Sequence, residues 1–230
     1  AGSLLNADGA SLRGANDAAV AVGGAMTNDG SITAGRHTAV AAGSLQSGST
    51  GVLGAGIQSD GKLGAAGDLV VTTTGALVAN GTNLAAGNAT LQGESVDLSA
   101  SQTSAANIAV TATRGNVTTN QATITTPGTL SVTANAQPGQ TLVNQGGKLN
   151  ANQLDLRVSN LANTNGGEIV QTGTGATAIA VAGTLNNDGG RIASNGLDLS
   201  LGGATITNAG GKIEHAGTGK LAITGGSYSG

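Results

Sequence analysis

One eight-residue pattern, repeated at a nearly constant interval, constrains the fold of this chain more than any other feature. Residues 185–192 read LNNDGGRI, and residues 206–213 read ITNAGGKI. Each copy is followed by a polar turn and by a short run of alternating apolar residues, such as LDL at residues 197–199. The isoleucines that end the two copies, Ile192 and Ile213, lie 21 positions apart. A repeat of about twenty residues is typical of a solenoid that adds one coil per repeat.

The apolar residues of the repeat alternate with polar ones, which is the pattern of a half-buried strand rather than of a helix. Each run is also short and bounded by glycine-containing turns, as strands are. Short strands at a solenoid period predict an all-β fold, a parallel β-helix. At roughly 20–23 residues per coil, the chain would form about ten or eleven coils. With strands about 4.8 Å apart, the rod would be roughly 50 Å long.

We expect a single β-helix domain over residues 1–230, divided into three zones. Residues 1–76 are predicted to form regular coils, with a lengthened turn or small excursion at residues 43–56, after which the repeat resumes at Ile57. Residues 77–141 keep the strand alternation but lose the Asn-x-Gly-Gly turn, and Ser and Thr fill the outer positions. Residues 142–224 carry the strict Asn-Gly-Gly repeat.

Composition agrees with a β-helix better than with an ordinary globular core. The chain has no Cys, Trp or Phe and a single Tyr, although aromatic side chains normally supply much of a core. Stacked coils can be filled by small aliphatic residues instead. The net charge is −3 without any basic run, so we expect no nucleic-acid partner. The chain has no signal peptide, transmembrane run or initial Met, and we interpret it as a segment of a longer protein.

The asparagine of the repeat is predicted to point into the coil. In a strand, residues i and i+2 share one face, so an Asn two positions after the leading aliphatic residue faces inward with it. Stacked Asn side chains can hydrogen-bond from coil to coil and so satisfy their buried amides. We therefore predict a structural ladder of Asn28, Asn144, Asn163, Asn187 and Asn208. One extra residue in the coil at Leu161 leaves either Asn163 or Asn165 as its member.

The other repeat positions are expected to serve the fold rather than a ligand. Gly pairs would supply the positive φ angles that turn the chain at corners. The residue before the second aliphatic position would face solvent and form an outer column of charges. Its members are Lys148, Glu168, Arg191 and Lys212.

No arrangement of residues indicates catalysis. Carboxylates are scattered, and His37 and His215, which we interpret as exposed loop residues, lie far apart. Glycosidase-type sites need clustered carboxylates and usually aromatic platforms, neither of which the chain provides. The calcium-binding nonapeptide and the EF-hand loop are also missing. We therefore expect no catalytic residue, no metal, no cofactor and no enzyme activity.

The repeat resembles the haemagglutinin repeats of filamentous haemagglutinin and of related two-partner secretion exoproteins, which include contact-dependent growth inhibition effectors. The resemblance is sharp over residues 142–224, fair over residues 4–71 and weak over residues 77–141. It implies a right-handed β-helical shaft that is exported through an outer-membrane transporter and is secreted or displayed at a bacterial cell surface. The Asn-Pro motifs of the family's secretion domain are absent here, and no toxin domain is visible. The segment is therefore similar to the interior of such a protein.

Two functions are compatible with this resemblance. The first is a monomeric shaft segment of a large adhesin, which mediates or spaces attachment to cells. The second is the stalk or receptor-binding segment of a contact-dependent growth inhibition toxin. A receptor on a host or bacterial cell, protein or glycan, would be the partner.

If the segment binds such a receptor, we expect contact through its irregular part. The best candidate for a protruding loop is the polar stretch of residues 134–141, because loops carried on a rigid scaffold are where recognition tends to sit. Its candidate binding residues are Asn135, Gln137, Pro138 and Gln140. The alternative is that the stretch only tolerates variation and that the segment is a spacer.

Overall fold

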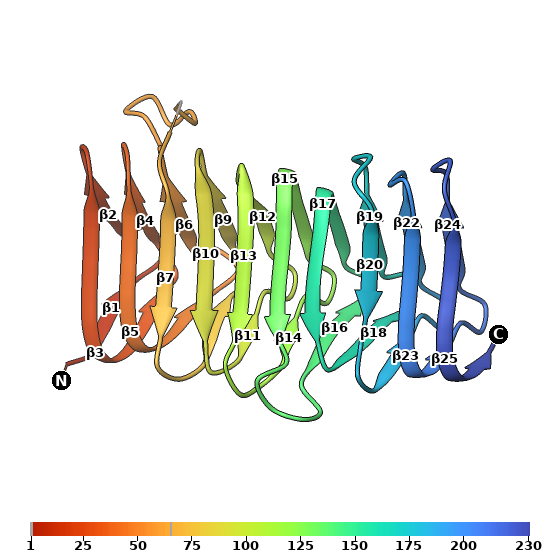
Figure 1. Cartoon of the computed structure of the whole chain (residues 1–230). Helices are drawn as coiled ribbons and strands as arrows, with labels where there is room; N and C mark the ends of the chain where they lie inside the picture. The colour runs from red at the N-terminus through yellow and green to blue at the C-terminus, as the bar shows by residue number, and fades with distance from the viewer. Residues whose placement is uncertain (1, 65) are drawn as a thin grey trace.

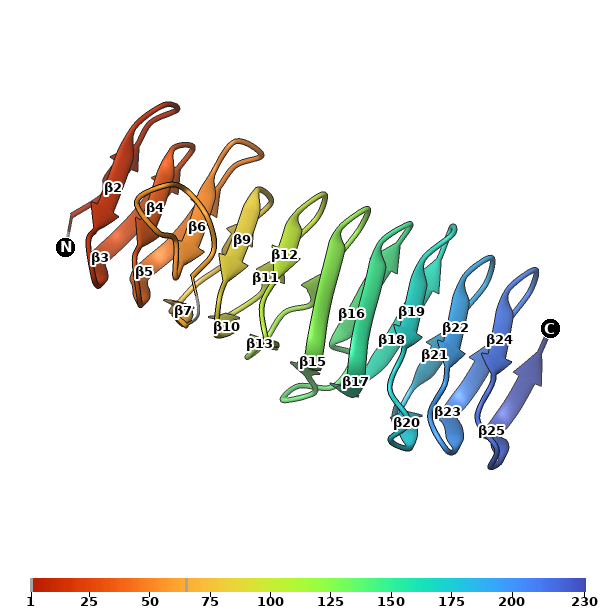
Figure 2. The ribbon, with the colours of Figure 1, turned by 90° about the horizontal axis from the view of Figure 1, so that it is seen from above.

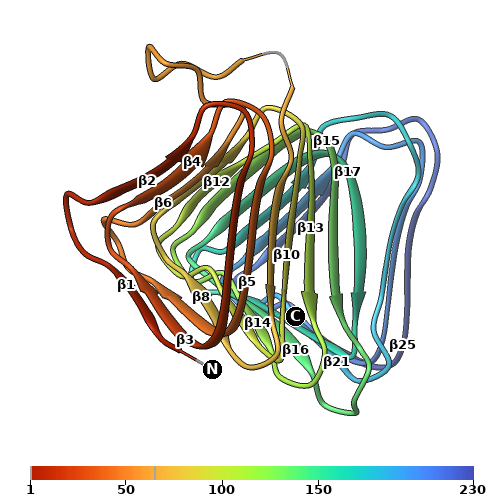
Figure 3. The same cartoon turned by 90° about the vertical axis from the view of Figure 1, so that its left-hand side faces the viewer.

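The chain forms a parallel β-solenoid of about 11 turns, which is described by a computed structural model over residues 2–64 and 66–230 (Figure 1). In this part of the chain all regular structure is strand. Seen from the N-terminal end, the chain runs clockwise as it recedes, so the solenoid is right-handed (Figure 3). Successive coils follow one another along a single axis (Figure 2). The predicted fold class is confirmed. Within the described residues, no helix is long and apolar enough to cross a membrane.

Each coil has three faces, which we call A, B and C in the order in which the chain passes through them. Successive coils pair in parallel along face A. Six long strands bend around a corner and belong to two faces, so they appear twice below. The strands of face A are β1 (Leu4–Asn6), β3 (Ala18–Asn28), β5 (Thr38–Ser47), β8 (Leu77–Ala79), β11 (Val96–Asp97), β14 (Val117–Thr118), β16 (Thr141–Gln145), β18 (Asn160–Thr164), β21 (Thr184–Asn186), β23 (Leu199–Thr207) and β25 (Leu221–Ser229).

Faces B and C repeat the same parallel arrangement. Face B consists of β2 (Ser11–Gly14), β4 (Ser31–Ala34), β6 (Val52–Ala55), β9 (Thr82–Ala85), β12 (Gln102–Ser104), β15 (Thr123–Ala134), β17 (Lys148–Val158), β19 (Glu168–Gln171), β22 (Arg191–Ser194) and β24 (Lys212–His215). Face C consists of β3, β5, β7 (Leu69–Thr73), β10 (Asn88–Gly93), β13 (Asn107–Ala112), β15, β17, β20 (Thr177–Ala180), β23 and β25.

The core is built from columns of small aliphatic side chains, one per coil at each register position. On face A the leading aliphatic residue of one coil lies directly over that of the next, as Leu142, Leu161 and Leu185 do. All three are buried, and so are the corresponding residues of most other coils. Each side chain therefore packs between the matching strands of the two neighbouring coils. This is why a chain without Phe or Trp can still fill its core.

One sequence-based prediction about the first zone is wrong. Residues 44–47 and 52–55 pair in register with their neighbours, so the lengthened turn predicted at residues 43–56 is a regular coil. The departure from the repeat follows it, between β6 and β7, and protrudes at the top of Figure 1. There Ile57 and Leu63 form an antiparallel bridge, and Gly61 adopts a positive φ of 81°.

The prediction failed because this excursion imitates the repeat. Its residues 57–63 read IQSDGKL, which has the spacing of a strand followed by a glycine turn. In the structure the glycine closes a hairpin, in which Gln58 donates its backbone N–H to the Lys62 carbonyl at 2.8 Å. Ile57 is buried outside the solenoid, within contact distance of Gly54 on face B. Arg13 fixes the hairpin base by donating to the Ile57 carbonyl at 2.9 Å.

The inward and outward assignment can be tested on two adjacent residues of β16. Replacing the buried Leu142 by Ala should lower the free energy of unfolding by about 2–5 kcal/mol, because it leaves a cavity between two stacked coils. Replacing Val143, which faces outward, by Ala should cost under about 1 kcal/mol. Chemical denaturation of both variants measures this difference, and equal losses would contradict the assignment.

Candidate functional site

Four of the predicted asparagines form a continuous column inside face A. The Asn144 Nδ2 atom donates to Asn163 Oδ1 at 2.8 Å, and Asn163 donates in the same way to Asn187 at 2.7 Å. Asn187 donates to Asn208 at 2.6 Å. Asn163, and not Asn165, is the member from its coil, since Asn165 adopts a left-handed φ of 53° and begins the turn.

Each amide of this column also bonds to backbone at the start of face B. Asn163 donates to the Arg191 carbonyl at 3.1 Å, and Asn187 donates to the Lys212 carbonyl at 3.1 Å. Both of these carbonyls belong to the next coil. Each of these two Asn side chains therefore bonds to both a side chain and a backbone carbonyl of the next coil. Its polar atoms are satisfied although it is fully buried.

A shorter column of the same kind lies near the N-terminus. Asn6 donates to Asn28 Oδ1 at 2.7 Å, and Asn28 donates to Ser47 Oγ at 3.0 Å. Sequence reasoning did not include Asn6 in the ladder, although the spacing Leu4-x-Asn6 carries the same signal. Between the two columns the register position is occupied by Ala79, Leu98 and Thr119.

In that middle zone a buried polar pair lies on face B instead. Asn83 Nδ2 donates to Thr103 Oγ1 at 3.1 Å, at a register position that Leu53 and Ile124 occupy in the flanking coils. In residues 77–141, which lack the Asn-Gly-Gly turn, this face B pair accompanies the gap in the asparagine column, and the face A contact returns at Thr119, whose hydroxyl donates to Asn144 Oδ1 at 2.9 Å.

The two glycines of each pair have different roles. The first adopts a positive φ, 65° at Gly189 and 63° at Gly210. The second does not, contrary to the expectation that both supply such corners. It is confined by the ladder instead, because an added Cβ at Gly190 would collide with the backbone carbonyl of Asn163 in the preceding coil.

The loop between β15 and β16 contains the four candidate binding residues. Asn135, Gln137 and Pro138 are exposed, whereas Gln140 is 3% exposed. The Gln140 Nε2 atom donates to the Gly115 carbonyl at 2.6 Å, and its Oε1 atom accepts the Gln137 N–H at 2.6 Å. Gln140 therefore holds the loop onto the preceding coil, and only the other three side chains are available at the surface.

Two neighbouring hollows lie beside this loop on face C. They have volumes of about 490 and 450 Å³ and share Asn135, Ser159 and Ala182 in their linings. The first also contains an ion pair between Arg157 Nε and Asp155 Oδ1 at 3.0 Å. Together the loop and the hollows form a recessed surface next to the three exposed candidate residues.

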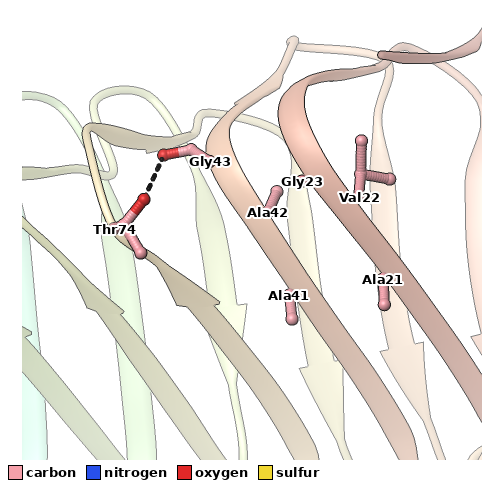
Figure 4. A pocket seen from close by; sticks show the side chains of 7 residues that line it. All are labelled: Ala21, Val22, Gly23, Ala41, Ala42, Gly43 and Thr74. Atoms are coloured by element: carbon pink, nitrogen blue, oxygen red, sulfur yellow. Dashed lines mark hydrogen bonds between the residues drawn. The ribbon is translucent and has the colours of Figure 1, made fainter. Parts of the chain in front are cut away.

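A further hollow, on the N-terminal coils, carries little chemistry. It has a volume of about 310 Å³ and is lined mainly by small residues such as Ala21, Ala41 and Gly43 (Figure 4). Thr74 is the polar side chain of its lining, and its hydroxyl already donates to the Gly43 carbonyl at 3.2 Å.

The predicted outer column of charges is in register on face B, where Lys148, Glu168, Arg191 and Lys212 lie side by side. The ion pair of Arg191, however, is made to Glu214 of the next coil, with Nε and Oε2 2.6 Å apart. His215 is not a loop residue as expected: it lies in β24, with Nε2 2.9 Å from the Gly196 carbonyl oxygen. Within residues 2–64 and 66–230, no group of three or more potential metal ligands comes together.

The corner between faces B and C carries a second, exposed set of coil-to-coil contacts that sequence reasoning missed. Arg36 donates two hydrogen bonds to the Asp17 carboxylate, at 2.9 and 2.6 Å, and so holds the pKa of Asp17 well below its usual range. Asp68 accepts the backbone N–H of Asn88 at 2.7 Å, and Asn107 accepts that of Thr129 at 2.9 Å. Each acceptor lies one coil before its donor.

The ladder can be tested at Asn187. Replacement by Leu should lower the free energy of unfolding by about 1–3 kcal/mol, because Asn163 loses an acceptor and Asn208 loses a donor in a buried environment. Replacement of the exposed Lys212 by Ser, on the outer column of the next coil, should cost under about 0.5 kcal/mol. Denaturant titration measures both, and the reverse ranking would contradict an inward role for the asparagine.

Two curated relatives match the chain. The first is "Toxin CdiA" of Yersinia pestis, which is 48% identical over 166 residues, 71% of this chain and 5% of that protein. The second is "tRNA nuclease CdiA-2" of Burkholderia pseudomallei (strain 1026b), which is 48% identical over 104 residues, 45% of this chain and 3% of that protein. The chain therefore spans only a small fraction of either relative. No protein-family model and no solved structure matches it.

The second relative corrects one prediction. We expected no enzyme activity, but a protein that shares this repeat segment is named a tRNA nuclease, which points to nuclease activity in the family. The expectation was based on residues of a segment that covers 3% of that protein, and such a segment does not decide what the family does.

At a coarse level, the similarity to these relatives supports a location outside the cell or at its surface. The resemblance expected from the repeat is confirmed: the sequence similarity and the β-solenoid together fit a filamentous haemagglutinin-like segment of a two-partner secretion or contact-dependent growth inhibition protein.

Proposed function

We propose that this segment is a shaft or stalk that sets the distance between other regions of a large exoprotein. The observation that carries the proposal is the unbroken parallel pairing of faces A and B from the first described coil to the last, in a sequence 48% identical to part of Toxin CdiA. In such a solenoid each coil contacts only its neighbours, so coils add length without changing the cross-section. About eleven coils at about 4.8 Å each extend over roughly 50 Å.

The full-length protein would have two kinds of partner, an outer-membrane transporter and a receptor on another cell. Export would take place through an outer-membrane transporter, and a chain without Cys carries no disulfide that would hinder its passage unfolded. The exported protein would meet a receptor, protein or glycan, on another cell. An adhesin shaft and the stalk of a contact-dependent growth inhibition toxin both use the segment in this way, and the two relatives are consistent with either setting.

If the segment itself touches a receptor, we propose the loop between β15 and β16 as the point of contact. Asn135, Gln137 and Pro138 are exposed on a rigid support, because Gln140 anchors the loop from below. The outward surface of the regular coils offers mainly Thr, Ser and Ala, without the aromatic anchors that usually dominate binding energy. The hollows beside the loop add recessed polar groups to its exposed tip.

The spacer role can be tested by removing one complete coil from a full-length exoprotein that carries this segment. Deleting residues 185–205 joins Thr184 to Ile206, which occupies the register position of Leu185. We expect the fold, surface display and cell binding to persist, with a shaft shorter by about 4.8 Å. Deleting residues 185–195 alone, which breaks the register, should abolish display. Loss of cell binding by the register-preserving variant, with display intact, would contradict a spacer.

The contact role of the loop requires a variant that keeps its anchor. Replacing Asn135, Gln137 and Pro138 by Ala leaves the Gln140 side chain and its bonds to the preceding coil in place. If the loop binds the receptor, cell binding should fall at least about tenfold with display unchanged, as expected when exposed contact residues are truncated. The matched control is Gln140→Ala, which removes the anchor of the loop and should lower the free energy of unfolding before it affects receptor binding. Unchanged binding by the triple variant would rule the loop out as the contact.

A further inference from the structure

One coil carries an insertion at the corner between faces B and C. The same two register positions flank this corner in three successive coils, as Ala34 and Thr38, Ala55 and Leu69, and Ala85 and Ala89. In the first and third of these coils three residues, 35–37 and 86–88, link the two faces. In the second coil 13 residues, 56–68, do so. The second coil therefore has ten residues more than the register requires.

The solenoid is complete without this insertion. On face B, β6 pairs in register with β4 before it and with β9 after it. On face C, β7 pairs in the same way with β5 and β10. The hairpin of residues 57–63 lies within the insertion, so it is carried by a scaffold whose strand pairing does not depend on it.

The base of the hairpin is bonded to the preceding coil. The backbone N–H groups of Gly56 and Ile57 donate to the carbonyls of Arg36 and Ala34, at 2.7 and 2.8 Å. The Gln58 side chain donates to a further carbonyl of that coil at 3.2 Å. The hairpin therefore leaves the corner in a fixed direction.

A socket on the outside of face B receives the Ile57 side chain. Residue 54 is a glycine, and an added Cβ there would lie 3.0 Å from Ile57 Cγ1, so the absence of a side chain makes the room that Ile57 occupies. Thr33, the register partner of Gly54, faces outward and is nevertheless buried. Ordering these residues costs conformational entropy, which the socket and the bonds at the base offset.

The tip of the hairpin presents an apolar side chain between charges of opposite sign. Leu63 is 46% exposed, although leucine is usually buried. The Lys62 Nζ atom lies 3.4 Å from Asp60 Oδ2, and the Lys62 side chain is 82% exposed. The Asp60 carboxylate also accepts the Lys62 backbone N–H at 3.1 Å, which fixes the turn. This tip protrudes beyond the other coils at the top of Figure 1 and Figure 3.

The chemistry of the tip and of the corner around it fits a protein surface. The corner carries the ion pair of Arg36 with Asp17, and Asp68 lies at its end. Nucleic acids and anionic membranes select uniformly basic surfaces, which these carboxylates interrupt. A glycan presents hydroxyl groups and has no apolar pocket for Leu63. A protein interface, in contrast, combines an apolar centre with a polar and charged rim.

We propose that the hairpin of residues 57–63 is a docking element for a protein partner, whose surface offers an apolar pocket to Leu63 and charged groups to Asp60 and Lys62. The proposal goes beyond a spacer. It is also independent of the contact proposed for the loop between β15 and β16, because that loop lies at the corner between faces C and A.

Removal of the insertion tests the role of the hairpin in a full-length exoprotein that carries this segment. Deleting residues 57–66 leaves Gly56, Gly67 and Asp68, three residues as in the coils on either side. Gly56 keeps its partner Arg36, and Asp68 still accepts the Asn88 N–H. We expect unchanged surface display, and attachment at least about tenfold weaker to cells that the parent protein binds.

A point variant tests the tip without shortening the chain. Leu63→Asp should lower attachment by at least about tenfold with display unchanged, because it places a charge in the apolar pocket of the partner. The matched control is Leu197→Asp between β22 and β23, where the leucine is 53% exposed, and it should bind as the parent does. If the deletion variant is not displayed, Leu63→Asp decides. Full attachment by a displayed Leu63→Asp variant would overturn the proposal.

Treatment of the target cells tests the class of partner. Proteinase K should remove the part of the attachment that depends on Leu63, measured as the difference between the parent and Leu63→Asp. Periodate, which cleaves the vicinal diols of glycans, should leave this difference in place. The opposite result would overturn a protein partner. Loss of attachment in the triple variant of the loop between β15 and β16, together with full attachment by Leu63→Asp, would support the loop and overturn the hairpin.

Discussion

The register between successive coils is the constraint on which the rest of this structure depends. A single coil of about twenty residues cannot bury its own apolar side chains, so each becomes stable only when the next coil places the same residue type over it. Leu142, Leu161 and Leu185 illustrate this on face A. A shift of one residue would turn all of these side chains toward solvent, because strand faces alternate with a period of two. The asparagines, glycine pairs and corner acceptors all act to prevent such a shift.

Polar residues specify the register more narrowly than aliphatic ones do. A leucine accepts several neighbours of similar size, whereas Asn163 satisfies its amide only if Asn144, Asn187 and the Arg191 carbonyl are all in place. The second glycine of each pair then fits because nothing larger could pass the carbonyl of the preceding coil. The Asn and the second Gly of the repeated Asn-x-Gly-Gly pattern therefore serve one interaction. The Asn side chain makes the hydrogen bonds between coils, and the Gly leaves the space that this arrangement needs.

The difference between features that recur in every coil and features that occur once explains which parts of the structure could be predicted from the sequence. Period and alternation recur in every coil, so they identified the solenoid, and they placed the asparagines on its inner side. Features that occur once were missed. The excursion after Ile57 has the local spacing of a strand, and only its packing outside face B reveals it as a hairpin. Gln140 and Gln171 are buried because of how loops close in three dimensions, which no spacing along the chain records. The function of a whole family is likewise not contained in a segment that spans 5% of one relative and 3% of the other.

Two irregular features of the molecule lie next to each other: the loop between β15 and β16, and an interrupted step of face C at which β17 and β20 form no parallel ladder. The loop between β15 and β16 precedes the interrupted step, and the Ser159 hydroxyl donates to the Gln137 carbonyl at 3.2 Å from the end of β17. Asn135 lines the same hollow as Ala178 and Ala180 of β20. The proposed contact loop and the hollow beside it are therefore positioned by the same residues at the end of β17. A receptor that occupies this surface would meet side chains that the fold already holds in place, so binding would cost less conformational entropy than binding to a free loop does.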